Sequence, residues 1–176
     1  MIEHYIREFE EELREIRHQI HENPELGLQE FKTSALVAEM LRQWGYEVEQ
    51  GLATTGVVAT LKVGDGEKSI GLRADMDALP IYENSGKPWA SKHPGLMHAC
   101  GHDMHVAMLL GTAKLLCRHR EDFAGTVKLI FQHSEDTLPG GAKELVEVGA
   151  LENPHVDAIF GMHVFPDEEV GKIGFH

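Results

Sequence analysis

The chain has 176 residues, the size of one ordinary domain with room for a buried core. Its 16 basic and 29 acidic residues give a formal charge of −13, which argues against nucleic acid or an anionic membrane as a partner. No apolar stretch is long enough to span a bilayer, the first residues lack a signal-peptide profile, and two cysteines make no disulfide framework, so we expect a cytoplasmic protein.

The first part of the chain is expected to contain two helices followed by two strands. Apolar residues at helical spacing predict helices over residues 3–21 and 30–44. Short β-branched runs predict strands over 57–63 and 69–73, and the Gly64-Asp65-Gly66 sequence between them is typical of a β-hairpin.

The rest of the chain begins with a long irregular stretch from residue 75 to 97 and then alternates helices with strands. The elements predicted there are a helix over 102–118, a strand over 127–132, a helix over 141–148, and strands over 158–163 and 170–175. This alternation indicates an α/β fold, a three-layer sandwich with a largely parallel mixed sheet. We find no repeat, low-complexity segment or linker.

Residues 97–105 hold a thiol, three imidazoles and a carboxylate directly ahead of a predicted helix. Cys100 and His102 are separated by one glycine, so both side chains can point at one ion from a tight turn. We expect the helix N-terminus to lower the pKa of the Cys100 thiol and to make it a better metal ligand. For an isolated pair of this kind, a buried cysteine beside solvated histidines is the more common explanation.

Further ligand-type side chains gather at the ends of the predicted strands. They are Asp75 and Asp77 after one strand, Glu135 and Asp136 after another, and His163 at the end of a third. Sites in α/β sheets lie beyond the carboxyl ends of the strands. Two adjacent carboxylates cost free energy to desolvate unless they are paired or bound to metal, although a solvated turn before Pro139 is the simpler alternative for that pair alone.

Five sequence blocks, in one order and along almost the whole chain, carry a family resemblance. They are IHENPEL at 20–26, GLRADMDALP at 71–80, HACGHD at 98–103, FQHSED at 131–136 and GMHV at 161–164. With these blocks the chain resembles the N-terminal part of the N-acyl-amino-acid amidohydrolases. That family includes hippurate hydrolases, N-acetyl-amino-acid deacetylases and auxin-conjugate hydrolases, and it is grouped with the co-catalytic metallopeptidases related to aminoacylase.

The resemblance implies hydrolysis of the amide bond of N-acyl amino acids or peptides at a centre of two divalent ions, namely zinc, manganese, nickel or cobalt. By position, Cys100 would bridge the ions, and the further ligands would be His102, Asp136 and His163. Mixed nitrogen, oxygen and sulfur ligands suit zinc or another borderline ion better than magnesium or calcium.

The resemblance also implies roles for the remaining site residues. Glu135 would be the general base that activates water and passes the proton to the leaving amine. Asp77 is assigned to the catalytic residues together with Glu135, with the role of orienting a ligand. Three further residues are expected to orient the metal ligands through hydrogen bonds without binding the ions themselves. They are Asp75, Asp103 and His105.

Two features depart from the family pattern. The family usually has two glutamates where this chain has Glu135-Asp136, so the shorter aspartate must draw its loop toward the metal or bind more weakly. Family chains are also longer, because they insert a lid and dimerisation domain and then supply another histidine ligand. We interpret residues 1–176 as the N-terminal portion of the catalytic domain without the lid. Alone it would be weakly active or inactive, and its partner would be a second copy or a complementing C-terminal half.

Three alternatives remain open. A thiol-dependent hydrolase with Cys100 as nucleophile would be inactivated by alkylation but not by chelators. A metal-binding or regulatory module would bind ions without catalysis. A degenerate remnant would fold poorly and do neither.

Overall fold

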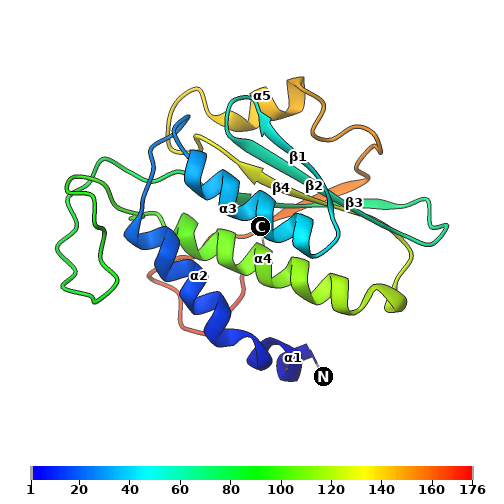
Figure 1. Cartoon of the computed structure of the whole chain (residues 1–176), viewed down its shortest axis with the longest axis horizontal. Coiled ribbons are helices and arrows are strands. Elements are labelled where there is room, and N and C mark those ends of the chain that lie inside the picture. Colours follow the sequence, from blue (N-terminus) through cyan, green and yellow to red (C-terminus); the bar gives the residue numbers. More distant parts are fainter. Residues whose placement is uncertain (1, 176) are drawn as a thin grey trace.

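The computed structural model describes residues 2–175, which build one five-stranded sheet with helices on both faces (Figure 1). The helices are α1 (Ile2–Glu8), α2 (Glu10–Glu22), α3 (Phe31–Gln43), α4 (His102–Arg118) and α5 (Gly141–Glu147), with a 3₁₀ turn at Arg120–Asp122. The strands are β1 (Glu47–Leu52), β2 (Gly56–Val63), β3 (Ser69–Asp75), β4 (Gly125–Gln132) and β5 (Ala158–Gly161). Helices α2, α3 and α4 cover one face of the sheet and α5 covers the other, so the predicted three layers are present.

The sheet has the strand order β1-β2-β4-β3-β5. Strands β4, β3 and β5 are parallel to one another, whereas β2 runs antiparallel to both β4 and β1. The sheet is therefore mixed, as predicted, with two parallel and two antiparallel pairings. Because the three parallel strands end at the same edge, the residues that follow them are brought together there.

Alternate residues of β4 enter two separate cores. Leu129 and Phe131 pack beneath α2, α3 and α4, whereas Ile130 packs with Leu145 of α5 on the opposite face. Every residue of β4 is buried, as expected for a central strand covered on both faces. Even Lys128 is buried, and its ammonium donates hydrogen bonds to two backbone carbonyls beyond α5.

The hairpin expected at residues 64–66 was wrong. Residues 64 and 65 do form a turn, but the two strands that it connects, β2 and β3, are not neighbours in the sheet. Strand β4 lies between them. Strand β2 pairs antiparallel with β4, and β3 pairs parallel with β4 from the other side. Both strands bury apolar side chains against α2–α4, and placing β4 between them completes that core.

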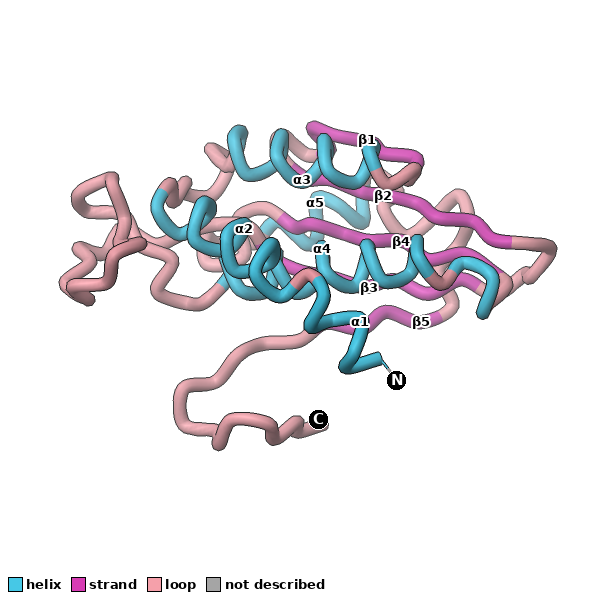
Figure 2. Tube along the Cα trace, turned by 60° about the horizontal axis from the view of Figure 1, so that its bottom comes forward, coloured by secondary structure: helices cyan, strands magenta, loops and turns pink. Residues whose placement is uncertain are grey.

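Three other elements differ from the prediction. The helix expected over 3–21 is two helices, because Phe9 leaves the helical backbone region with φ −124°. Strand β1 was missed because its residues are mostly exposed and polar and give no apolar signal. The strand expected over 170–175 does not form, since this segment has exposed side chains and no strand beside it. Figure 2 shows the chain after β5 running away from the layers.

The remaining predicted elements agree with the structure to within two residues, and the irregular stretch between β3 and α4 is present. Among residues 2–175, no helix has both the length and the apolar character needed to cross a membrane.

Candidate metal centre

The predicted ligands meet where β3, β4 and β5 end and α4 begins. His102 is the first residue of α4 and belongs to three groups of possible metal ligands, each made of His102 and two neighbours. Within each group the ligand atoms lie within 4.8 Å of one another. The pairs of neighbours are Cys100 with His163, Asp75 with His105, and Asp77 with Asp136. The structure therefore brings together all four predicted ligands and most of the residues expected to support them.

The two ring nitrogens of the fully buried His102 have different surroundings. Nδ1 donates a hydrogen bond to Asp77 Oδ1 at 3.2 Å, so in the neutral imidazole the lone pair is on Nε2, where it can bind an ion. Nε2 has no hydrogen-bond partner in the described part of the chain. It faces carboxylate oxygens of Asp75 at 3.6 Å, Glu135 at 3.6 Å and Asp136 at 3.9 Å. A buried, unpartnered nitrogen among carboxylates is the environment that a divalent cation would satisfy.

Cys100 and His163 form a second pair of ligand atoms. His163 donates from Nδ1 to the carbonyl of Val164 at 2.7 Å, so its Nε2 lone pair points at Cys100 Sγ, 3.3 Å away, and accepts a hydrogen bond from the thiol. With zinc–sulfur and zinc–nitrogen bonds of about 2.3 and 2.0 Å, two ligands of one tetrahedral ion lie roughly 3.5 Å apart. The spacing of this pair thus fits one ion.

Gly101 makes the approach of Cys100 and His102 feasible. It has φ +87°, in the left-handed region that favours glycine. A Cβ atom at this position would also lie 2.6 Å from the Val164 side chain, in the segment that carries His163. The residue between the two ligands therefore has both a conformational and a steric reason to lack a side chain.

The supporting residues link this edge of the sheet together. His105 donates from Nδ1 to Asp75 Oδ1 at 2.6 Å and accepts the amide N–H of Val164 at Nε2, 3.1 Å away. Burial raises the pKa of Asp75, but the hydrogen bond from His105 and the charges of His102 and Arg73 outweigh it and lower the value to about 2. Asp75 therefore stays ionised, and His105 connects it to the segment that follows β5.

Asp77 has a second contact besides the one with His102. Its Oδ2 accepts the backbone N–H of Asp136 at 2.9 Å. One carboxylate thus fixes both the imidazole of His102 and the position of the turn after β4. Asp77 is also in one of the three groups of close ligand atoms, with His102 and Asp136, so its orienting role stays a prediction.

Asp103 lies away from the ligands, on the side of α4 that faces α2. It accepts hydrogen bonds from Arg17 Nε at 3.0 Å and from His21 Nδ1 at 2.8 Å. The hydrogen bond to Asp103, opposed by burial, raises the pKa of His21, and the carboxylate of Glu83 adds to the increase. Asp103 therefore supports His102 indirectly, by anchoring the first turn of α4.

Several contributing residues were missed from the sequence. His21 and Glu83 belong to this anchor. His98 is buried beside it, and neither of its ring nitrogens is hydrogen-bonded to any residue between 2 and 175. Burial lowers the pKa of His98 to about 4. His21 and His98 lie within the resemblance blocks, but nothing in their spacing indicates that they share one buried cluster with Asp103.

The expectation that the helix N-terminus lowers the pKa of Cys100 was wrong for the protein without metal. Burial and the negative charges of Asp136 and Glu135 raise the pKa of this thiol to about 11. Burial and the surrounding carboxylates both disfavour the thiolate, and both oppose the partial positive charge of the helix end. A thiol that is protonated at neutral pH is a poor nucleophile, whereas a bound cation would favour the thiolate.

We therefore expect iodoacetamide to alkylate Cys100 slowly near pH 8 in metal-free protein, because only the thiolate reacts. The rate should rise about tenfold per pH unit and level off near pH 11. Mass spectrometry of the Cys117→Ser variant follows Cys100 alone. A rate that is already maximal below pH 8 would contradict this assignment and favour the thiol-dependent hydrolase.

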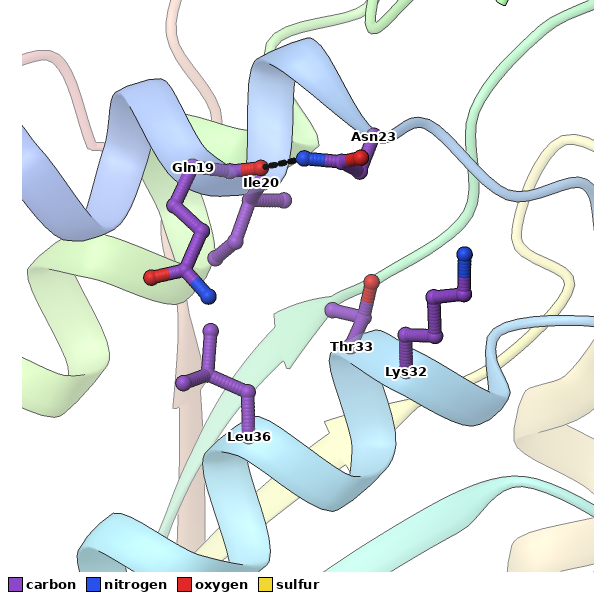
Figure 3. Close-up of a pocket in the computed structure, with 6 residues that line it drawn as sticks. All are labelled: Gln19, Ile20, Asn23, Lys32, Thr33 and Leu36. Carbon is purple, nitrogen blue, oxygen red and sulfur yellow. Dashed lines mark hydrogen bonds between the residues drawn. The ribbon is translucent and has the colours of Figure 1, made fainter.

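The cavity drawn in Figure 3 is remote from these residues. It has a volume of about 200 Å³ and lies between α2 and α3, lined by Gln19, Ile20, Asn23, Lys32, Thr33 and Leu36. An apolar hollow of similar volume lies beside His105 and Phe160, next to the segment that carries His163. None of the four predicted ligands lines either cavity.

Comparison with known sequences points to one family. The profile of Peptidase family M20/M25/M40 matches residues 71–176. Hippurate hydrolase from Campylobacter jejuni is 49% identical over 161 residues, which are 92% of this chain and 41% of the relative. N-acyl-L-amino acid amidohydrolase from Geobacillus stearothermophilus is 43% identical over 158 residues, which are 90% of this chain and 42% of the relative. The chain thus spans about two fifths of the length of these relatives.

Comparison with solved structures agrees. A dinuclear metal binding peptidase from the M20 family of Bacillus subtilis matches with a TM-score of 0.85 and 42% identity. The match covers 92% of this chain and 44% of that chain. The α/β layers therefore share their fold with a protein that is described as a dinuclear metal binding peptidase.

Proposed function

Because the chain belongs to Peptidase family M20/M25/M40, we propose that it supplies the metal-binding part of a hydrolase that cleaves the amide bond of N-acyl amino acids or short peptides. The observation that carries the proposal is the buried, unpartnered Nε2 of His102 among the carboxylates of Asp75, Glu135 and Asp136. The names of two relatives, hippurate hydrolase and N-acyl-L-amino acid amidohydrolase, support this substrate class.

In this proposal Cys100, His102, Asp136 and His163 would hold two divalent ions, with Cys100 as the ligand that the two ions would share. Bound there, such ions would polarise the scissile carbonyl and lower the pKa of water. Among zinc, manganese, nickel and cobalt, the thiolate and imidazole ligands favour the three softer ions over manganese, which prefers oxygen ligands. Both cysteines are free thiols, the state maintained in the cytoplasm, so we propose the cytoplasm as the compartment.

The proposed general base is Glu135. Its side chain is partly exposed at the rim of the centre, and Oε2 lies 3.6 Å from His102 Nε2. A carboxylate in this position can take a proton from the attacking water and deliver it to the leaving amine. Asp77 would assist as an orienting residue, because its hydrogen bonds fix the tautomer of His102 and the backbone of Asp136.

The proposal is tested by comparing two proteins on N-acetyl- and N-benzoyl-amino acids, each with added zinc, manganese, nickel or cobalt. One is the 176-residue chain, and the other is this chain fused to the remaining part of the Campylobacter jejuni relative. We expect the fusion to hydrolyse at least one substrate and to lose activity reversibly on chelation.

We expect the chain alone to be slower than the fusion by a factor of about 10² or more, since poor positioning of substrate alone costs that much. Release of the free amino acid measures both rates, and size-exclusion chromatography tests for the predicted self-association. Equal turnover by the chain alone, as a monomer, would contradict this expectation. A fusion that binds metal but hydrolyses none of these substrates would instead indicate a metal-binding module without catalysis.

A further inference from the structure

Glu30 is a fully buried carboxylate just before α3, and its contacts lie far away in the sequence. Its Oε1 accepts the backbone N–H of Ser134 at 2.9 Å, and its Oε2 accepts the hydroxyl of Thr55 at 2.6 Å. Glu30 and Ser134 are 104 residues apart. Within residues 2–175 no basic side chain forms an ion pair with Glu30, so these two neutral donors are what satisfies its buried oxygens.

The carboxylate of Glu30 is not needed to cap its own helix. The Glu30 side chain makes no capping hydrogen bond to α3. The first turn of that helix is capped by Glu25 instead, which accepts the backbone N–H groups of Lys32 and Thr33. The buried carboxylate of Glu30 is therefore free to serve the turn after β4.

That turn has an unusual backbone. Ser134 has φ +51°, a left-handed conformation that is unfavourable for a residue with a side chain. The segment before Glu30 lies directly against it, because a Cβ atom on Gly27 would be 2.9 Å from Ser134 Oγ and 2.8 Å from Thr137 Oγ1. The surroundings hold the chain in a shape that it would not adopt by itself.

The two amides next to Glu135 are both held by buried carboxylates. Glu30 accepts the N–H of Ser134, and Asp77 accepts the N–H of Asp136, each at 2.9 Å. We propose that Glu30 is a positioning residue, which fixes the turn at Ser134 so that the carboxylates of Glu135 and Asp136 face His102. This inference rests on the proposed function for its consequence, but the contact itself can be tested without metal.

The first test measures amide hydrogen exchange of metal-free protein by NMR. In Glu30→Ala the Ser134 amide should exchange about tenfold or more faster, because it loses its buried hydrogen-bond acceptor. The Phe131 amide, inside β4, is the internal reference, since a general loss of stability would accelerate both. Glu30→Gln should stay near the wild type, because its amide oxygen can still accept from Ser134 and its NH₂ can donate to Thr55.

The second test titrates the same proteins with Co²⁺ and follows the visible spectrum. Glu30→Ala should bind Co²⁺ about 10- to 100-fold more weakly, which is the usual loss when a residue that orients a metal ligand is removed. Glu30→Gln should bind within about threefold of the wild type. The matched control is Leu41→Ala, which removes a buried side chain of α3 outside the centre and should leave Co²⁺ affinity unchanged.

The outcomes separate this inference from the proposed function. A wild-type chain that binds no Co²⁺ would contradict the proposed function, while the exchange of Ser134 would still decide the role of Glu30. Unchanged exchange in Glu30→Ala overturns the inference, and so does faster exchange with unchanged Co²⁺ affinity in a metal-binding chain. Equal Co²⁺ loss in Leu41→Ala also overturns it. If Glu30→Ala does not fold, Glu30→Asp replaces it, because the shorter carboxylate cannot reach Ser134 with the turn in place.

Discussion

Replacing Glu135 by glutamine is expected to leave the metal content of the fused, full-length enzyme intact and to lower its turnover number by about 10²- to 10⁴-fold. The amide is nearly the same size as the carboxylate but cannot accept a proton at neutral pH. Glu135 Oε2 lies beside His102 Nε2 without belonging to any of the three groups of close ligand atoms. Metal analysis by mass spectrometry and amino acid release under saturating substrate give the two quantities.

The matched variant is Asp136→Asn, which changes the neighbouring carboxylate in the same way. Asp136 lies in one ligand group with Asp77 and His102, so its amide variant should lose metal along with activity. Should Glu135→Gln lose metal while Asp136→Asn keeps it, the two residues have been assigned the wrong way round.

Replacing Cys100 by alanine is expected to have the largest effect on metal binding. We expect the wild-type chain to hold at least about one equivalent of zinc or cobalt after reconstitution, and Cys100→Ala less than about a tenth of an equivalent. A bridging thiolate bonds to both ions, so its loss weakens both, whereas His163→Ala would affect one ion. Metal content and the charge-transfer absorption of a cobalt–thiolate bond measure the result.

The control for this experiment is the other cysteine. Cys117 lies in the last turns of α4 and donates to the Trp44 carbonyl, remote from the candidate centre. Cys117→Ser should therefore keep the metal and its absorption band. Wild-type metal content in Cys100→Ala would remove the bridging thiolate from the proposed centre.

The sequence predicted well those features that depend on local patterns. The helix over 102–118 has the predicted limits, because its apolar spacing is regular and Gly101 stops it at one end. The location of the centre was also predictable, since Asp75 ends β3, and Asp136 and His163 come shortly after β4 and β5. Residues at the carboxyl ends of parallel strands meet wherever those strands are neighbours.

Features that depend on pairing between distant segments were not predictable. The turn at residues 64–66 looks like a hairpin because nothing nearby in the sequence shows that β4 will lie between β2 and β3. Glu30 reads as an ordinary residue at a helix start, and its partner Ser134 is known only from the folded chain. The raised pKa of Cys100 likewise results from carboxylates contributed by other segments.

The contacts of the centre join residues that are far apart in the chain, with consequences for how the protein folds. Asp77 and His102 are 25 residues apart, Cys100 and His163 are 63 apart, and Glu30 and Ser134 are 104 apart. Closing such loops costs chain entropy before any contact compensates for it, so an unfolded chain offers an ion few preformed ligands. Nearly all of the binding free energy therefore favours the native state, and the apparent melting temperature should rise with free metal concentration. In refolding, the ion would bind only after the sheet has formed, because its ligands come together only then.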